Sequence, residues 1–343
     1  MLYHYKYPRA KIQKIQSFVN YIMLEVVLKA KKIPDTVFSE KLVLTKYVPF
    51  LNEINSDYIL TPVEKMYGIS KKLDALHLKI LRKAVYENNR IEELCEGKHI
   101  PITYKYLESV FKQDFEKEML NAIKGFCKNL YDNCLGLAPV YSRYGKLKNY
   151  HDLIVDDDGT CPFCGNSSME TKYSNPRNAF DHYLAKQKYP FVSINFKNLV
   201  PTCYTCNSLY KKAKDVLFYR GKRYKAFYPF AKDKYNININ IKFKHDIIYK
   251  KDLSTDDIVL TCTCVGHQEE TDNWMRIYDI QNRYKAKCCE KGVKALLTTI
   301  VERISTSKYS KDEILYLYEK NMMSDMNFLK VPFFKTALDS LNL

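Results

Sequence analysis

The chain has 343 residues, of which 46% are hydrophobic, and it carries 55 Lys and Arg against 39 Asp and Glu, a formal net charge of +16 at pH 7. This length predicts two or three domains, and the hydrophobic fraction excludes an intrinsically disordered protein. The sequence has no apolar stretch of membrane-spanning length, and its first residues lack the apolar core of an export signal, so we expect a cytoplasmic protein without a membrane partner. Eleven cysteines in such a protein are expected to be thiols or metal ligands rather than disulfides.

Residues 1–150 are predicted to be helical. Apolar residues recur at helical spacing in the first segment, at Ile12, Ile15, Phe18, Val19 and Ile22. Thr61 and Glu64 form an expected capping box with Pro62 at the first helical position, and a further helix is expected from Tyr104 to Leu130. These stripes are typical of a core and indicate no chemistry. The region is a candidate docking surface for a partner protein or nucleic acid.

The middle of the chain contains two pairs of cysteines, each separated by two residues. Cys161 and Cys164 form the first pair, and Cys203 and Cys206 form the second. Two intervening residues let one tight turn present both sulfurs to a single ion, and two such turns complete a tetrahedral site. A lone pair of this kind can serve redox chemistry, but the two pairs together favour structural zinc. The long stretch between Cys164 and Cys203 indicates an insert between the two knuckles.

The insert carries three short motifs in a fixed order. Phe180–Leu184 reads FDHYL, Asn198–Pro201 reads NLVP, and Asn207 directly follows the last cysteine. Over residues 155–235 this order resembles the HNH endonucleases, the ββα-metal nucleases, and especially bacterial members of which some act in anti-phage defence. A weaker similarity continues over residues 274–284. The lysine that often follows the asparagine by three residues is replaced here by Tyr210, and Lys211 comes next.

This resemblance implies a catalytic site separate from the zinc. It implies that His182 is the general base, that Asp181 and Asn207 hold one catalytic Mg²⁺ or Mn²⁺, and that Asn198 holds the loop that aims His182. The residue chemistry agrees with these roles, because imidazole accepts a proton near neutral pH and a carboxylate is a hard oxygen ligand. Adjacent residues on a strand point to opposite faces, so Asp181 and His182 need a twist or bulge in order to converge.

Positive charge is concentrated around the cysteines. From Cys161 to Tyr235 there are 14 Lys and Arg against four Asp and Glu. A basic run from Lys211 to Lys234 is interleaved with aromatic residues, which suits either an ordinary solvated face or a patch that follows nucleic-acid phosphates, and beside the nuclease motif we favour the patch. Its candidate phosphate-binding residues are Lys211, Lys212, Lys214, Arg220, Lys222 and Arg223.

Beyond residue 235 the hydrophobic period changes from helix to strand. Apolar and polar residues alternate in two segments, at positions 237–243 and 258–264, which predicts a β-pair. Helices are expected around Trp274–Tyr284 and after the capping box formed by Ser310 and Glu313. The predicted fold class is α+β, with a helical domain (1–150), a nuclease domain with structural zinc (151–235), and a C-terminal β-hairpin with helices packing on the nuclease domain (236–343).

The sequence thus leads to a functional hypothesis with two alternatives. The hypothesis is a metal-dependent endonuclease that hydrolyses DNA phosphodiester bonds by nicking or paired nicking, as the effector of an anti-phage system. The first alternative is a zinc-stabilised nucleic-acid-binding module without cleavage. The second is a nuclease subunit that stays silent until a partner such as an ATPase activates it. The sequence leaves open whether the nucleic acid is DNA or RNA and whether the protein is an oligomer.

Overall fold

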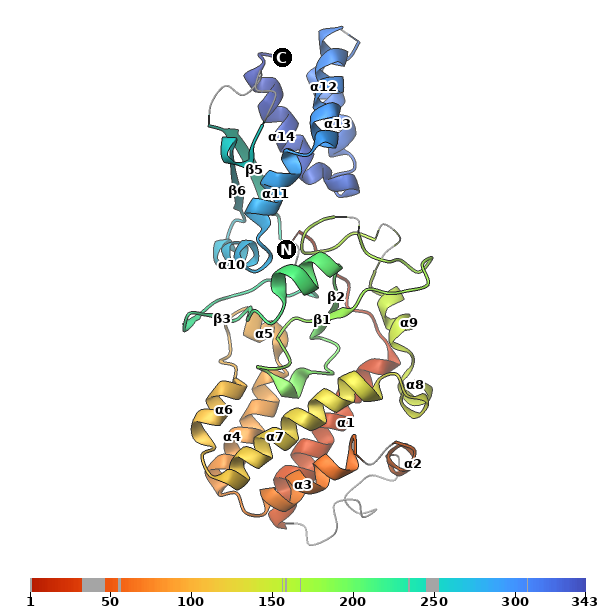
Figure 1. Ribbon diagram of the computed structural model, residues 1–343, viewed down its shortest axis with the longest axis vertical. Coiled ribbons are helices and arrows are strands. Elements are labelled where there is room, and N and C mark those ends of the chain that lie inside the picture. The colour runs from red at the N-terminus through yellow and green to blue at the C-terminus, as the bar shows by residue number, and fades with distance from the viewer. Residues whose placement is uncertain are drawn as a thin grey trace.

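A computed structural model describes residues 2–32, 47–54, 57–155, 157, 159–166, 168–233, 235–244, 253–306 and 308–343. The molecule is elongated, with most of the N-terminal helices at one end, small two-stranded sheets in the middle, and a hairpin with the C-terminal helices at the other end (Figure 1). The described residues form mostly helices together with small two-stranded antiparallel sheets, so the predicted α+β class is confirmed. Among the described helices, none is long and apolar enough to cross a membrane.

The described elements are as follows in chain order. The helices are α1 (Ile15–Tyr21), α2 (Val48–Asn52), α3 (Leu60–Ser70), α4 (Ala75–Asn88), α5 (Ile91–Cys95), α6 (Tyr104–Val110), α7 (Asp114–Asn129), α8 (Ala138–Tyr144), α9 (Leu147–Asp152), α10 (Gln268–Tyr278), α11 (Ile280–Cys288), α12 (Lys291–Ser305), α13 (Lys311–Glu319) and α14 (Asn327–Ser340). The strands are β1 (Phe180–His182), β2 (Leu199–Pro201), β3 (Phe218–Tyr219), β4 (Lys222–Arg223), β5 (Asn238–Phe243) and β6 (Ile258–Thr263), and each consecutive pair forms an antiparallel sheet. Among the shorter helical segments, Thr205–Lys211 follows β2.

The N-terminal helices pack around the apolar stripes that the sequence shows. All five apolar residues of the first predicted stripe are buried, and helix α3 packs along α7. Met119, Ile123 and Phe126 repeat on one face of α7 at helical spacing, and none of them is exposed to solvent. This part of the chain is therefore a layer of helices whose apolar faces are buried in the hydrophobic core of the molecule.

Two predicted helix boundaries in this region are wrong. The expected helix from Tyr104 to Leu130 is broken between α6 and α7, because the Glu116 carboxylate accepts hydrogen bonds from the backbone N–H groups of Lys112 (2.7 Å) and Gln113 (2.9 Å) and so starts a new helix. The expected cap at Thr61 is also not used. Helix α3 begins at Leu60, after Ile59, and no side chain caps it.

The C-terminal hairpin follows the alternation of the sequence. Ile239 pairs with Cys262 and Ile241 with Leu260, and all four side chains are buried, whereas the polar residues between them face solvent. The predicted β-pair is therefore confirmed, and helix α14 covers its apolar side.

The C-terminal helices differ from the prediction at one point. The helix expected across Trp274–Tyr284 is divided into α10 and α11, because Asp279 takes a left-handed conformation with φ of +52°. The capping box of α13 is confirmed. The Ser310 hydroxyl accepts from the backbone N–H of Glu313 (3.2 Å), and the Glu313 carboxylate accepts from the N–H of Ser310 (2.8 Å).

The first residues of the chain do not belong to the helical end of the molecule. The N–H of Leu2 donates to the carbonyl of Pro162, and the N–H of Tyr5 donates to that of Pro229, both at 2.9 Å. Figure 1 accordingly places the N-terminus in the middle of the molecule.

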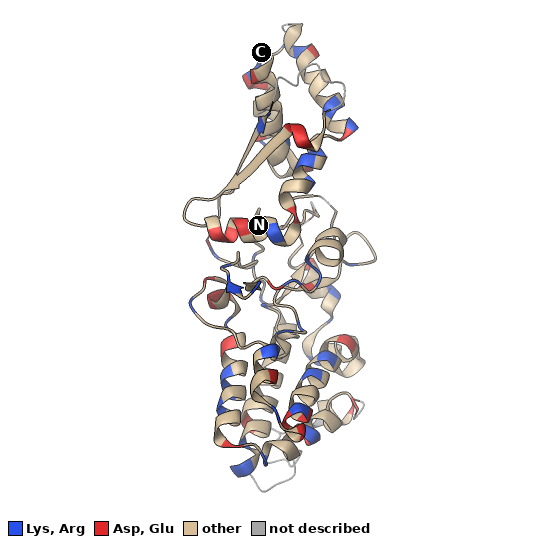
Figure 2. Cartoon of the chain, turned by 60° about the vertical axis from the view of Figure 1, so that its left-hand side comes forward, with Lys and Arg blue, Asp and Glu red and all other residues tan. Residues whose placement is uncertain are grey.

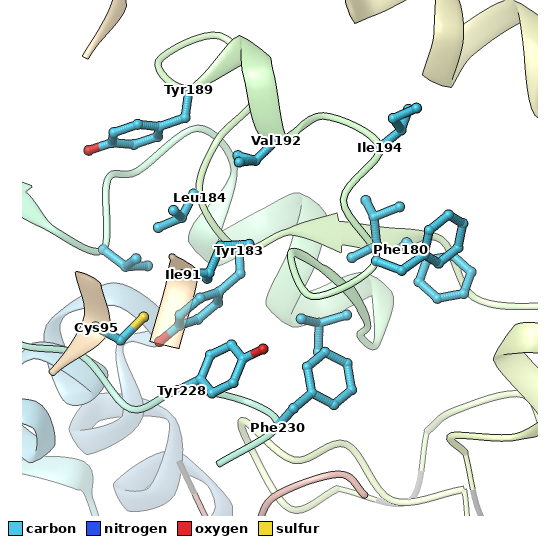
Figure 3. Packing of buried hydrophobic residues seen from close by; sticks show 14 of the residues in the cluster. Ile91, Cys95, Phe180, Tyr183, Leu184, Tyr189, Val192, Ile194, Tyr228 and Phe230 are labelled. Atoms are coloured by element: carbon cyan, nitrogen blue, oxygen red, sulfur yellow. The ribbon is translucent and has the colours of Figure 1, made fainter. Parts of the chain in front are cut away.

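The segment between β1 and β2 is a packed core rather than a surface loop. Figure 3 shows side chains of this segment and of its neighbours packed together, among them Ile91, Cys95, Tyr183, Leu184, Tyr189, Val192, Ile194, Tyr228 and Phe230. Because these side chains come from helix α5, from the segment itself and from the chain after β4, the core fixes the loop between the two strands from several sides.

Candidate functional site

The four cysteines that the sequence pairs as knuckles converge in the structure. The sulfurs of Cys161, Cys164, Cys203 and Cys206 all lie within 4.8 Å of one another, and all four residues are buried. In the second knuckle, the backbone N–H of Cys206 points at the sulfur of Cys203 at 3.4 Å. This cluster could hold a structural metal ion such as zinc.

The spacing of the sulfurs fits a tetrahedral ion. Zinc–sulfur bonds of about 2.3 Å at tetrahedral angles place two sulfurs roughly 3.8 Å apart. The sulfurs of Cys164 and Cys203, one from each knuckle, are 3.8 Å apart. Four thiolates around a dication leave an excess of negative charge, which a buried site must offset with a nearby cation.

Helices α10 and α11 provide that cation and hold the first knuckle. A guanidinium nitrogen of Arg283 lies 3.3 Å from the sulfur of Cys206. The indole N–H of Trp274 donates to the carbonyl of Phe163 (2.8 Å), and the hydroxyl of Tyr284 donates to that of Cys164 (3.1 Å). These three residues fall in the stretch 274–284 that the sequence marks only by a weak similarity, and the structure shows what they do there.

Strands β1 and β2 position the candidate catalytic residues. The two strands pair in register, with Asp181 opposite Val200 and His182 opposite Leu199, and the second knuckle then leads into the helical segment Thr205–Lys211. Since this segment ends at Lys211, its last side chain can reach back to β1. The order of the elements is strand, strand, helix.

His182 is held in one tautomer. Its Nε2 lies 2.9 Å from the backbone carbonyl of Ser193, and because a carbonyl oxygen only accepts, Nε2 must carry the proton. Its Nδ1 then has the free lone pair. Burial lowers the pKa of His182 to about 3, and the Lys186 ammonium adds to this shift, so the ring is neutral near pH 7. The ring of Tyr131 packs edge-on against the imidazole at 4.3 Å between centroids.

Asn198 fixes the loop that carries Ser193. Its side-chain oxygen accepts from the N–H of Leu184 (2.7 Å), and its side-chain nitrogen donates to the carbonyls of Leu184 (3.0 Å) and Val192 (3.2 Å). The residue is fully buried, so no water competes for these bonds. Because Val192 precedes Ser193, the amide of Asn198 sets the position of the carbonyl that orients His182.

Asp181 is paired with a lysine that the sequence places on the surface. The ammonium of Lys211 lies 2.8 Å from Oδ1 of Asp181 and 2.8 Å from the carbonyl of His182, and the lysine side chain is fully buried. The other carboxylate oxygen, Oδ2, is buried and has no hydrogen-bond partner among the described residues. Burial raises the pKa of Asp181 above its usual value, and the charge of Lys211 opposes that shift.

This arrangement does not fit the expected catalytic divalent ion as the side chains stand. One ligand atom, Oδ2 of Asp181, is available, but the Lys211 ammonium beside it would repel a dication. Asn207 is half-buried in the helical segment, and within the described part of the chain its side chain makes no hydrogen bond to Asp181. A divalent ion at this place would have to displace Lys211.

The six predicted phosphate-binding residues are divided between the interior and the surface. Lys211 is buried in its ion pair, and the guanidinium of Arg223 donates to the backbone carbonyls of Leu94, Leu217 and Tyr224, so neither side chain is free to meet a phosphate. Three others are exposed in the described structure, at Lys212, Arg220 and Lys222. Lys214 is exposed but donates to the carbonyl of Ile277 (3.1 Å).

The aromatic residues of the basic run are stacked with the chain's own cations. Arg276 from helix α10 lies over the rings of Tyr219 (4.3 Å) and Tyr224 (5.5 Å), and Lys222 also lies over Tyr224 (5.1 Å). Figure 2 shows basic and acidic residues mixed along the helices at both ends of the molecule. The alternating charged and aromatic side chains of the run therefore contact one another within the hairpin β3–β4 and contact Arg276 of α10.

Comparisons with known proteins give one distant relative. Protein ea31 of Escherichia phage lambda is 27% identical over 143 residues, which make up 40% of this chain and 43% of that protein. The chain thus matches less than half of the length of this relative. No protein-family model matches the chain, and no solved structure matches it. The similarity is too distant and too partial to assign a family.

Proposed function

We propose that this protein hydrolyses nucleic-acid phosphodiester bonds, with DNA as the substrate and His182 as the general base. The observation that carries the proposal is the hydrogen bond from Nε2 of His182 to the Ser193 carbonyl, which leaves Nδ1 as a proton acceptor. Nδ1 takes a proton from water while the water oxygen bonds to phosphorus. The bond from phosphorus to the 3′ oxygen then breaks, the leaving oxygen takes up a proton from solvent, and the His182 imidazolium returns its proton to solvent.

The surroundings of His182 support this role. Asn198 fixes the carbonyl that selects the tautomer of His182. Structural zinc in the four-cysteine cluster is part of the proposal, because the second knuckle leads directly into the segment whose Lys211 holds Asp181. A catalytic Mg²⁺ or Mn²⁺ at Asp181 and Asn207 would first need Lys211 to leave Asp181, so the dependence of cutting on either ion is measured directly.

A plasmid-relaxation assay tests the proposal. Wild-type protein, His182→Ala and a control variant, His99→Ala, are incubated with supercoiled DNA, with and without Mg²⁺ or Mn²⁺. His99 is paired with Glu87 and Glu93 and, in the described structure, has no hydrogen bond or ion pair with His182, so its removal should leave cutting unchanged. We expect nicked or linear DNA from the wild type and from His99→Ala, and a loss of about a hundred-fold or more from His182→Ala. Equal cutting by all three proteins would refute the assignment.

The Lys211–Asp181 pair favours a second candidate, a nucleic-acid-binding module without cleavage. The Lys211 ammonium already occupies the carboxylate that a catalytic ion would need as a ligand. In that case neither the wild type nor His182→Ala cuts, and both bind the plasmid equally. Cutting that begins only when a partner protein such as an ATPase is added would instead indicate a silent nuclease subunit.

A further inference from the structure

A cavity of about 900 Å³ lies between the first residues of the chain and the segment after β4. Its walls come from residues 2–7 and 9 on one side and from residues 228, 230–232 and 235–236 on the other, and Glu92, Lys197 and Met323 complete it. None of the candidate catalytic residues and none of the four cysteines lines it. Pockets that hold small molecules have volumes of about 300–1,000 Å³, so the cavity is large enough for a ligand.

The walls of the cavity are fixed by the fold. The N–H of Tyr5 donates to the carbonyl of Pro229 (2.9 Å), which ties the two walls together. Within the lining, the ring of Phe230 packs against Tyr7 (5.1 Å) and Tyr228 (6.0 Å). The site is thus built before any ligand arrives, which lowers the entropic cost of binding.

The lining combines aromatic rings with cations. Tyrosine rings line both walls, and the ring of His4 packs edge-on against Tyr235 at 4.5 Å. The buried Nε2 of His4 has no hydrogen-bond partner among the described residues, and burial lowers the pKa of this histidine to about 4, so the ring is neutral. The flat tyrosine rings of the two walls suit a flat heterocycle.

Positive charge surrounds this aromatic lining. Lys6, Arg9, Lys197 and Lys232 line the cavity and are exposed, and within the described chain none of them forms an ion pair. The acidic residue of the lining is Glu92. Four cations against one carboxylate favour a ligand that carries negative charge, and their free ammonium and guanidinium groups suit phosphate oxygens.

We propose that this cavity binds an unpaired nucleotide, with its base among the tyrosine rings and its phosphate on the surrounding cations. Stacking on aromatic side chains together with backbone contacts to Lys and Arg is the way in which proteins bind unpaired bases. A purely apolar ligand would leave the four cations unused, and a small anion without a ring would leave the aromatic walls unused. The nucleotide has two sources, a free nucleotide or one residue of a single strand. Binding of a nucleotide in this cavity does not require cleavage at His182.

Fluorescence anisotropy with two probes tests the proposal. The probes are a short labelled oligo-dT strand and labelled AMP, and every protein carries His182→Ala so that the strand stays intact. The charge-reversed variant is Lys6→Glu with Lys232→Glu, and the control is Lys105→Glu, an exposed lysine of helix α6 that does not line the cavity. All three replaced lysines are exposed, so we expect the variants to fold, which circular dichroism checks.

We expect the affinity to fall about ten-fold or more in the double variant and to stay unchanged in the control. For the single strand, the slope of log affinity against log salt concentration should become less steep by about 0.7 for each phosphate contact that is lost. This pattern with oligo-dT identifies a strand as the source, and the same pattern with AMP alone identifies a free nucleotide. Binding of neither probe would overturn the inference. So would a loss of affinity that is equal in the double variant and the control.

Discussion

At the scale of single residues, the Lys211–Asp181 pair decides what the centre of the candidate site can do. Both side chains are almost fully buried, and their contact is 2.8 Å long. A buried pair adds little net stability over an apolar pair, but removal of one partner leaves a charge without compensation. A substitution of either residue should therefore be tolerated only when the other residue changes with it.

We expect Lys211→Met to lower the free energy of unfolding by about 3–5 kcal/mol near neutral pH. Without the ammonium, burial raises the pKa of Asp181 further above its unfolded value. A carboxyl group whose pKa is raised in the folded state contributes stability at low pH, and this stability is lost as the pH rises. The loss of unfolding free energy caused by Lys211→Met should therefore be larger at pH 8 than at pH 5. Urea unfolding at both pH values measures it. The double variant Asp181→Asn with Lys211→Met should recover most of the loss, and a double variant as unstable as Lys211→Met alone would count against the pair.

Asn198 supports a second prediction at this scale. Asn198→Ala removes three buried hydrogen bonds, to the N–H and carbonyl of Leu184 and to the carbonyl of Val192. We expect a loss of roughly 2–4 kcal/mol of unfolding free energy, since the three backbone groups stay buried without partners. Thermal and urea unfolding measure the loss. Asn240→Ala, at an exposed position of β5, is the matched control, and equal midpoints for the two variants would refute the role given to Asn198.

At the scale of elements, the two knuckles link distant parts of the middle region. The first knuckle precedes β1, and the second connects β2 to the helical segment Thr205–Lys211. An ion bound by all four sulfurs would close this long loop. Loss of the ion should therefore loosen both the strand pair and the segment that ends at Lys211.

We expect purified protein to contain one zinc ion per chain and Cys203→Ser to contain almost none, because a tetrahedral site that loses one of four sulfurs binds the ion much more weakly. Elemental mass spectrometry measures the content, and a thermal melt should show a lower midpoint for the variant. The control is Cys289→Ser, since Cys289 lies outside the cluster. Full zinc content in Cys203→Ser would show that the cluster is not the zinc site.

At the scale of the whole molecule, the C-terminal helices depend on the knuckle. Trp274, Arg283 and Tyr284 from α10 and α11 all contact residues of the two knuckles or their backbone. The helical layer of α4 and α7 at the other end makes none of these contacts in the described structure. The two ends of the molecule should therefore respond differently to loss of the ion.

We expect removal of zinc by a chelator to increase amide hydrogen exchange in residues 161–166 and in helices α10 and α11, and to leave exchange in α4 and α7 unchanged. The contacts of Trp274 and Tyr284 with the knuckle carbonyls are the reason, since a disordered knuckle withdraws both acceptors. Mass spectrometry of peptides measures the exchange, and added zinc should return it to its original slow rate. An increase confined to residues 161–166 would contradict this dependence.

The features that the sequence determines are local ones. The spacing of Cys161, Cys164, Cys203 and Cys206 is enough to predict a four-sulfur cluster, because each knuckle is a single tight turn. The alternation in β5 and β6 and the apolar stripe of α1 depend on strand and helix periods that a few residues reveal. The break at Asp279 and the start of α7 at Asp114 escape prediction, because the first depends on one backbone conformation and the second on the contact of the Glu116 carboxylate.

Only the tertiary structure decides what the long side chains contact. The sequence predicts that Lys211 and Arg223 bind phosphate. In the folded protein Lys211 instead pairs with Asp181, and Arg223 donates to the carbonyl of Leu94 in helix α5. Arg283 reaches Cys206 in the same way, from a helix far along the chain. A flexible cationic side chain pairs with whatever buried oxygen or sulfur the fold brings within reach, and no local pattern encodes that partner.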